Sequence, residues 1–288
     1  MKIRQSVGDR IFLGIVYAIL IFFALMCLYP LYLIIISSFS DPAAVGQGKV
    51  LLYPMKLTIT AYTEAFRTDE ILVGYRNSLF YVLVGTALNL LLTIPAAYSL
   101  SHPKVKGKGV VMKLLVFTMY FSGGMIPSYL LVSSLGLRDS MWALIIPNII
   151  HTSNCIIMIN GFRATPESLY EAAYLDGAGD FQVFLRIALP LAKATIASLA
   201  LFYFMSHWND FFTPMLYLDS ADKMPLQVVL RSVLIEENTI EMDPTAGMLT
   251  PEGIKGAVIF ITMIPVMIVY PVVQRYFVGG VMMGSVKG

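Results

Sequence analysis

Long apolar runs alternate with shorter polar segments along most of this 288-residue chain. Runs of this length predict membrane-spanning helices, because about 20 residues at a rise of 1.5 Å per residue cross the ~30 Å hydrocarbon layer. Lipid offers the backbone no hydrogen-bond partner, so each run must be helical. We expect six spans, at residues 11–37, 78–101, 111–132, 141–160, 187–217 and 256–278.

Composition agrees with this pattern. Hydrophobic residues make up 57% of the chain and charged residues only 13%, and the mean hydropathy is +0.74. Soluble domains carry about 25% charged residues, so a water-soluble globule is excluded. The predicted fold class is an all-α, polytopic membrane protein with six transmembrane helices.

The first apolar run superficially resembles a signal peptide. It extends from Ile11 to Ile36, longer than the usual 7–15-residue apolar core, and no small-x-small cleavage site follows it. We therefore expect a retained first span. An even number of spans then places both chain ends on one side of the membrane.

Lysine and arginine indicate which side that is. They gather before the first span and in the turn "HPKVKGKG" at 102–109, between the second and third spans. Short basic flanks of this kind face the cytoplasm. We expect both termini and the segment 161–186 to be cytoplasmic, and the segments 38–77, 133–140 and 218–255 to lie outside.

The stretch "ESLYEAAYLDGAGDFQVFLRIALP", residues 167–190, is an acidic, glycine-bearing segment between two long apolar runs. Pro166 suits the start of a helix, and Thr165 is the expected cap. Residues spaced three and four apart predict a helix with a small, smooth face beside an acidic face: Leu169, Ala172, Ala173 and Asp176.

Two glycines follow that helix. Gly177 and Gly179 permit a sharp turn, because glycine tolerates positive φ. A second short helix is expected from about Asp180 to Ala188, leading through Pro190 into the fifth span.

Charge distinguishes two interpretations of this stretch. Helices that lie on lipid usually carry Lys and Arg on the polar face. Segment 163–186 instead has four acids against two bases, which are Glu167, Glu171, Asp176, Asp180, Arg163 and Arg186. This composition favours docking into a groove of a partner protein over a loop lying on the inner leaflet.

The same stretch resembles the EAA loop of ABC importer permeases. That pattern is E-A-A, three residues, G, then about nine residues to an apolar pair with proline. It is matched by Glu171, Ala172, Ala173, Gly177 and Pro190. The segments "RNSL" at 76–79, "WNDFFTPM" at 208–215 and "YFVGGVMMGSVKG" at 276–288 add a similarity to the carbohydrate-uptake class, most closely LplC/YtcP-like permeases. The resemblance extends from about residue 10 to the C-terminus.

This resemblance implies a MetI-like permease fold in a bacterial cell membrane. The loop would be a coupling helix docked in a cleft of an ATP-hydrolysing subunit. Glu171 would form the ion pair, Ala172 and Ala173 the packed face, and Gly177 the turn, while Asp176 matches a less strict position. The implied partners are a second homologous permease, two ATP-binding subunits that use ATP and Mg, and an extracytoplasmic solute-binding protein. No nucleic-acid partner is expected.

Three segments follow from this interpretation. Residues 1–76 form a first helix and an outer loop, residues 77–278 the permease domain, and residues 279–288 a cytoplasmic tail. The glycine-rich tail is not expected to continue the last helix far, and it either contacts the ATPase subunit or frays. The outer stretch 218–255 is either a solvated loop or a docking surface for the binding protein.

The chain carries no motif for chemistry of its own. It has no GxxxxGK[ST], since "GQGKV" at 46–50 and "KGKG" at 106–109 lack the spacing and the hydroxyl residue. We therefore expect a transport subunit without its own nucleotide site, not an enzyme. Three scattered histidines, with no CxxC or HExxH, predict no metal site. Cys27 and Cys155 are expected to be small core residues.

Polar residues inside spans indicate a candidate substrate pathway. Asp210 is the only acid in the six expected spans, and an acid at mid-bilayer costs about 2.5–3.5 kcal/mol on insertion scales. It either lines the pathway or forms a local network with Thr213 that bends the helix. The other candidates, on helical spacing or as aromatic and amide partners for sugar, are Tyr120, Asn148, His151, Asn154 and Asn209.

Other functions are less well supported. A self-contained secondary transporter or channel should carry several ion-coupling acids or broken helices at mid-membrane. A membrane-embedded enzyme would need a constellation such as paired histidine and acid, which the sequence lacks. An importer permease for a solute other than a sugar stays open.

Overall fold

The computed structural model describes residues 6–103, 105–235 and 251–284, which form helices and turns without a strand. The chain divides into two compact units. Unit 1 comprises Met1–Thr68 with Val233–Met263, and unit 2 comprises Asp69–Ser232 with Ile264–Gly288. The all-α class expected from the sequence is confirmed.

Unit 1 contains α1 (Val7–Ser38), α2 (Pro42–Gly46), α3 (Thr60–Arg67) and the first part of α15 (Pro251–Gly284). The most apolar stretch of α1 is wholly unburied within the chain, as expected of a helix that faces lipid. Near its end, the rings of Phe39, Tyr62 and Phe260 pack against one another in tilted and edge-on contacts. The Tyr62 hydroxyl also lies 2.7 Å from Ser38 Oγ, which fixes α3 against the end of α1.

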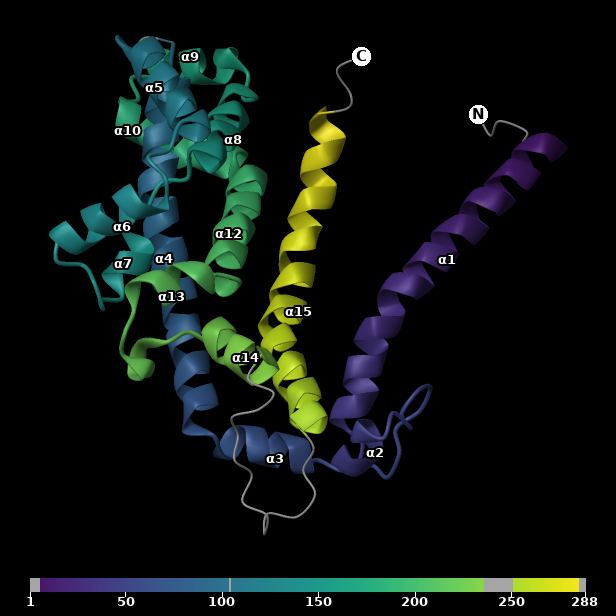
Figure 1. Ribbon diagram of the computed structural model, residues 1–288. Helices are drawn as coiled ribbons and strands as arrows, with labels where there is room; N and C mark the ends of the chain where they lie inside the picture. Colours follow the sequence, from purple (N-terminus) through teal and green to yellow (C-terminus); the bar gives the residue numbers. More distant parts are fainter. Residues whose placement is uncertain (1–5, 104, 236–250, 285–288) are drawn as a thin grey trace. The chain divides into compact units, whose positions relative to one another are not determined.

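Unit 2 is built around α4 (Asp69–Ser101), which packs along α8 (Thr152–Arg163) and α12 (Lys193–Trp208) (Figure 1). Small residues allow these helices to approach closely. At Gly161, for example, an added Cβ would lie 2.7 Å from Thr195 Cγ2. The buried core comprises Ala97, Cys155, Met158, Ile159, Phe162, Ala188, Ala192, Leu199 and Tyr203.

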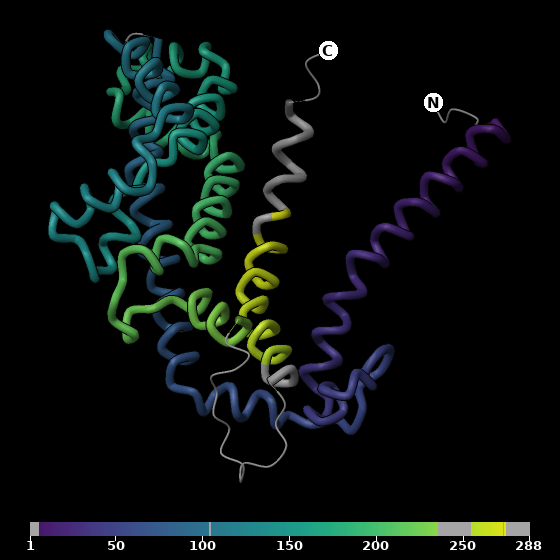
Figure 2. Tube along the Cα trace, in the orientation of Figure 1, coloured from purple at the N-terminus to yellow at the C-terminus, as the bar shows by residue number. Residues whose placement is uncertain are grey.

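Three of the expected spans are interrupted. In place of 111–132, α5 (Lys108–Tyr120) and α6 (Met125–Ser134) meet at 116° (Figure 2), where Gly124 has φ +87°. In place of 141–160, α7 (Trp142–Ile145) is separated from α8 by residues 146–151 without helix. The expected span 187–217 is bent by 77° just before α12, and its helix breaks again before α13 (Phe212–Tyr217).

The segment before α12 is a series of short helices separated by a turn at 176–179. It contains α9 (Glu167–Leu175), α10 (Asp180–Val183), a π-helical turn at Phe184–Ala188 and α11 (Leu189–Leu191). The expected second helix from Asp180 to Ala188 is thus present, with its second half wound as a π-helix.

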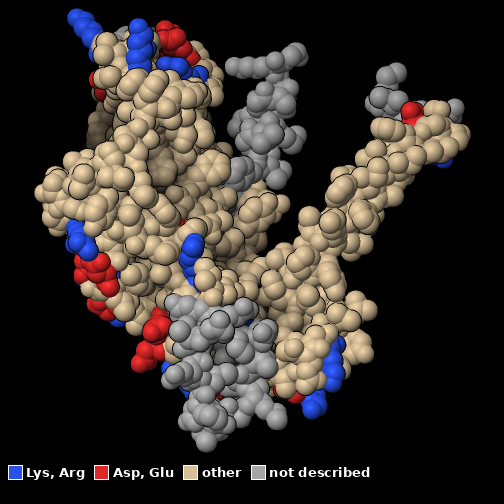
Figure 3. All heavy atoms as spheres, viewed as in Figure 1, with Lys and Arg blue, Asp and Glu red and all other residues tan. Residues whose placement is uncertain are grey.

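Within the described residues, three helices are long and apolar enough to cross a membrane. They are α1, α4 and Lys255–Val272 of α15, and the two bent pairs raise the number to five. The count of six stays a prediction. Figure 3 shows charged side chains where α5, α9 and α10 lie and again below α7, with a mostly uncharged surface between.

Several expected loops are helical. α4 begins at Asp69, nine residues before the expected span, and a 3-10 turn (Ala221–Lys223) and α14 (Leu226–Ile235) occupy part of the expected outer loop; residues 236–250 of that loop lie outside the described residues. α15 continues through the glycines at 279 and 280 to Gly284, although we expected the tail to end the helix sooner. Hydrogen bonding within the helix outweighs the low helix propensity of glycine there.

A polar brace joins the segment between α6 and α7 to the segment after α13. Asp139 Oδ1 accepts hydrogen bonds from the backbone N–H groups of Asp219 (3.1 Å) and Ser220 (3.0 Å), and Oδ2 lies 2.8 Å from Lys223 Nζ. Hydrogen bonds from Lys223 and Ser220 hold the pKa of the Asp139 carboxyl well below its ordinary value of 3.8.

We expect Asp139→Asn to lower the melting temperature by a few degrees. Asparagine keeps the shape and tolerates the φ of +52° at this position, but it removes the charge that Lys223 neutralises. Because the folded-state pKa is depressed, the stabilisation is complete above about pH 4 and is lost only as the pH falls below that value. The difference between parent and variant should therefore stay constant from pH 6 to 8 in thermal unfolding in detergent.

Asp219→Asn is the matched control. Its ion pair with Arg138 is exposed, with 60% and 54% of the side chains accessible, and such pairs contribute little. An equal loss of stability in both variants would contradict the role of Asp139.

Candidate functional site

The acidic hairpin comprises α9, the turn at 176–179 and α10. Gly177 has φ +81°, as the sequence predicted, and its N–H donates to the Tyr174 carbonyl at 3.1 Å. A Cβ added at Gly177 would meet no atom within 4 Å. Glycine is therefore favoured here by the positive φ and not by lack of space. Gly179 is extended at φ −77° and needs no glycine. The expected Thr165 cap is absent, because α9 begins directly after Pro166 with no side-chain cap.

The hairpin presents both acids and large apolar groups. Glu171, Ala172, Asp176 and Gly177 are exposed, as a docking surface requires. Ala173 differs from expectation, since it is packed within the chain and only 9% exposed.

Two apolar side chains on the hairpin were missed in the sequence. Leu175 is 88% exposed and Phe181 72% exposed, one on each side of the turn. The sequence did offer a signal for them, because large apolar residues stand out in a short, otherwise acidic helical segment.

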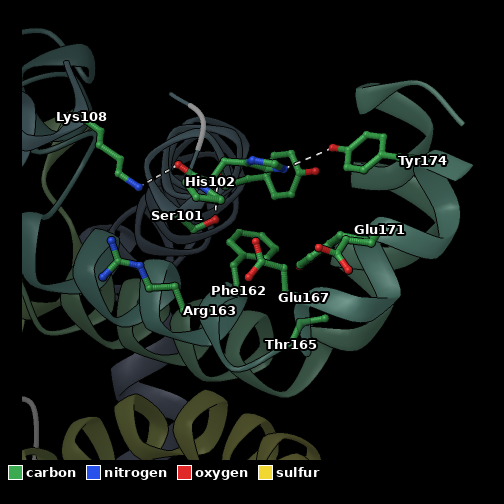
Figure 4. Close-up of a pocket in the computed structure, with 12 residues that line it drawn as sticks. Ser101, His102, Lys108, Phe162, Arg163, Thr165, Glu167, Glu171 and Tyr174 are labelled. Carbon is green, nitrogen blue, oxygen red and sulfur yellow. Dashed lines mark hydrogen bonds between the residues drawn. The ribbon is translucent and has the colours of Figure 1, made fainter. Parts of the chain in front are cut away.

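A cavity of about 350 Å³ lies behind α9. Glu167 and Glu171 line it from α9, and Lys108 and Arg163 from the ends of α5 and α8 (Figure 4). Acidic and basic groups therefore surround one space, which suits a polar protein surface better than lipid.

A second, polar pocket of about 260 Å³ lies deeper in unit 2. It brings together four of the residues expected along the pathway, Asn148, His151, Asn209 and Asp210. None of the described residues lining it is lysine or arginine. The remaining lining residues are Leu144, Met205, Ser206, His207 and Thr213.

Two expected pathway residues lie elsewhere. Asn154 is 7% exposed within α8, and Tyr120 is 78% exposed at the end of α5. Tyr120 borders a separate, apolar depression with Phe117 and Phe121. The amide of Asn154 and the ring of Tyr120 therefore do not share the polar pocket.

The pocket exists because the helix is broken there. Pro147 provides no N–H, and residues 146–151 leave the helical path. We expected Asn148 and His151 on one helix face with Asn154, which is wrong because the first two precede α8. Asn89 Nδ2 donates to the exposed carbonyls of Asn148 (3.1 Å) and Ile149 (2.7 Å), in place of the lost helix bonds.

Asn89 belongs to a buried network. Its Oδ1 lies 2.7 Å from His207 Nε2, so that nitrogen carries the hydrogen. A Cβ at Gly85 would lie 2.4 Å from the same ring nitrogen, so His207 needs glycine there. Thr93 Oγ1 lies 2.7 Å from the Tyr203 hydroxyl, which accepts the backbone N–H of His151 at 3.4 Å.

Sequence reasoning missed this network. Gly85, Asn89 and Thr93 recur every four residues and so share one face of α4. Small and polar residues at this spacing in an apolar run could have predicted a polar contact with neighbouring helices.

Asp210 forms the expected local contact with Thr213, while its role in a substrate pathway stays a prediction. Its Oδ1 accepts the backbone N–H of Thr213 at 3.0 Å, at the break between α12 and α13, and it also lines the polar pocket. Capping the helix start leaves the other carboxylate oxygen available to the pocket.

Residues 71–282 match the family described as the binding-protein-dependent transport system inner membrane component. The chain belongs to this family. It is therefore a membrane component of such a transport system, and the resemblance to importer permeases drawn from the EAA loop is confirmed. The match extends from near the start of α4 through most of α15 and so includes both the acidic hairpin and the polar pocket.

Individual relatives in this family are similar over nearly the whole chain. The polygalacturonan/rhamnogalacturonan transport system permease protein YtcP of Bacillus subtilis (strain 168) is 42% identical over 284 residues, 97% of this chain and 99% of that protein. Protein LplC of the same organism is 44% identical over 286 residues, 98% and 95% of the two chains. A solved bacterial ABC transporter involved in the import of the acidic polysaccharide alginate is 38% identical, with a TM-score of 0.90, and covers 96% of this chain and 100% of that one.

The described residues contain no group of three or more histidine, cysteine or acidic side chains that could hold a metal ion. Cys155 is buried, as expected, but Cys27 is exposed on α1 and is not a core residue. The lipid-facing position of α1 explains the difference.

We expect Asn89→Leu to destabilise the protein by about 1–3 kcal/mol, because two carbonyls and an imidazole N–H lose their buried partner. Thermal unfolding in detergent measures the change. Asn160→Leu on the exposed face of α8 is the matched control and should change stability little. Equal unfolding temperatures for the two variants would mean that Asn89 does not hold the break.

Proposed function

We propose that this chain is the transmembrane permease subunit of an ABC importer that translocates an oligosaccharide. The acidic hairpin α9–α10 carries this proposal. It is exposed, it turns at Gly177, and it carries the residues of the EAA loop in a chain that belongs to an importer family. In the proposal the hairpin receives force from a separate ATP-binding subunit.

Energy must come from outside the chain. The sequence has no phosphate-binding loop, so ATP and Mg would bind to the partner. Closure of two ATP-binding subunits around ATP would push the hairpin and tilt the attached helices from an inward-facing to an outward-facing arrangement. Such a shift requires that the partner bind the two states differently.

The distribution of charge supports an orientation. With both termini cytoplasmic, the basic turn after α4 and the acidic hairpin face the ATP-binding subunits, as the positive-inside rule favours. The brace at Asp139 then faces outward, on the side where an extracytoplasmic binding protein would deliver the cargo. A second homologous permease would complete the pore.

The polar pocket suits sugar hydroxyls. Amide, hydroxyl and imidazole groups can both donate and accept hydrogen bonds, as a sugar hydroxyl does. Asn148, His151, Asn209 and Asp210 would line the pathway there. The names of the relatives make oligomers of acidic sugars the first class to test.

Reconstitution tests the function. The chain is co-expressed with the second permease, the ATP-binding subunit and the binding protein, and is placed in proteoliposomes. We expect ATP-dependent uptake of labelled galacturonate or alginate oligosaccharides. Accumulation by the purified chain alone would instead identify a self-contained secondary transporter, and uptake of neither oligosaccharide would overturn the choice of acidic sugars as the substrate class.

We expect Glu171→Lys and Gly177→Pro to abolish the coupling of ATP hydrolysis to uptake while the protein stays in the membrane. The first reverses an exposed charge on the docking surface, and the second is incompatible with φ +81°. Gly179→Pro is the matched control, since φ −77° suits proline and its N–H makes only a long 3.4 Å hydrogen bond. Normal stimulated hydrolysis and uptake in both test variants would refute docking by the hairpin.

In the pocket, we expect the double variant Asn148→Ala and Asn209→Ala to lower oligosaccharide uptake by about 5- to 25-fold, the effect of losing two neutral hydrogen bonds. Both amides are exposed toward the pocket, so the fold should persist. Initial uptake rates over a range of sugar concentrations measure the effect. Asn160→Ala, outside the pocket, is the control, and parental uptake in the double variant would remove the pocket from the pathway.

A further inference from the structure

The turn at Gly177 is held locally by two backbone hydrogen bonds, from Gly177 N–H to the Tyr174 carbonyl (3.1 Å) and from Ala178 N–H to the Ala173 carbonyl (3.0 Å). Both bonds return to α9, so a tie from α9 to α10 must come from a side chain. Tyr174 provides the tie. Its hydroxyl donates to Asp180 Oδ1 at 2.9 Å, from the last turn of α9 to the first residue of α10.

The same hydroxyl also reaches the end of α4. His102 Nε2 lies 3.2 Å from the Tyr174 oxygen. Since the Tyr174 hydrogen is given to Asp180, the His102 nitrogen must donate. Figure 4 shows the two side chains pointing toward one another across the cavity. One hydroxyl thus connects α4, α9 and α10.

Other contacts hold His102 in place. The His102 carbonyl accepts a hydrogen bond from Lys108 Nζ at 3.0 Å, which closes the turn between α4 and α5. Its ring lies 5.8 Å from Tyr98 and 6.3 Å from both Tyr170 and Tyr174, measured between centroids. Burial raises the pKa of the Tyr174 phenol, so the hydroxyl stays protonated at physiological pH.

α4 carries this connection toward the polar pocket. It is one continuous helix from Asp69 to Ser101, with Pro95 inside it, and His102 directly follows its end. Thr93 and Asn89 lie about 12–18 Å from that end at 1.5 Å per residue. These are the residues that hold the broken segment and Tyr203 at the pocket. A displacement of the hairpin passed to α4 therefore reaches the pocket wall.

We propose that Tyr174 is a positioning residue for energy coupling, whose hydroxyl bridges His102 and Asp180 and passes movement of the α9–α10 hairpin into α4. The inference rests on the proposed function, in which the hairpin receives the force. Without the bridge, the hairpin bends at Gly177 and the movement is lost. The ATP-binding subunit still docks, because the exposed surface is unchanged.

The test compares two tyrosines on one helix in the complete reconstituted transporter. Tyr174→Phe removes the bridging hydroxyl and keeps the ring. Tyr170→Phe is the matched control, because the Tyr170 hydroxyl is buried with no hydrogen-bond partner among the described residues. The measured quantity is the amount of labelled galacturonate oligosaccharide taken up per ATP hydrolysed.

We expect Tyr174→Phe to lower this ratio by about ten-fold or more, the effect of losing a hydrogen bond to a carboxylate, while hydrolysis continues. Tyr170→Phe should keep the parental ratio. His102→Gln retains a donor of similar reach and should lose less than His102→Leu. This ordering is not expected of a residue that only stabilises the fold.

Three outcomes would overturn the proposal. They are a parental ratio in Tyr174→Phe, an equal fall in both tyrosine variants, and an equal fall in the two His102 variants. Failure of the proposed function shows in the parent instead, as a chain that neither co-purifies with the ATP-binding subunit nor takes up sugar with ATP.

Discussion

A helix in an apolar environment can be interrupted only where other groups replace its lost backbone hydrogen bonds. Asn89 meets this requirement in unit 2. Its amide satisfies the carbonyls of Asn148 and Ile149, and its own oxygen is satisfied by His207. Without this arrangement the chain between α7 and α8 could not leave the helical path, and the polar pocket would have no wall on that side.

The same face of α4 determines much of the surrounding packing. Gly85 makes room for His207, and Thr93 meets Tyr203 within the buried core of α4, α8 and α12. The Thr93–Tyr203 and Asn89–His207 contacts are polar, which makes a wrong arrangement of these helices costly and specifies a single one. These polar contacts thus specify the relative positions of the helices more tightly than the surrounding apolar side chains do, because apolar side chains can exchange neighbours.

α4 also connects the two candidate functional regions. At one end it carries His102, which contacts the acidic hairpin through Tyr174, and further along it carries the residues that hold the pocket. In the proposed function, this continuous helix would pass movement from the hairpin, where the separate ATP-binding subunits would act, to the polar pocket.

The sequence by itself determined the membrane class, the α1 and α4 spans, the position of the acidic hairpin and the positive φ at Gly177. These follow from local properties, namely the length of apolar runs, charge and the freedom of glycine. Only the tertiary structure decided that Ala173 faces inward, that the fourth span breaks at Pro147, and that Asn148 and Asp210 share a pocket while Tyr120 does not. A break is stable only when a distant residue, here Asn89, supplies the missing hydrogen bonds, and no local pattern records that pairing.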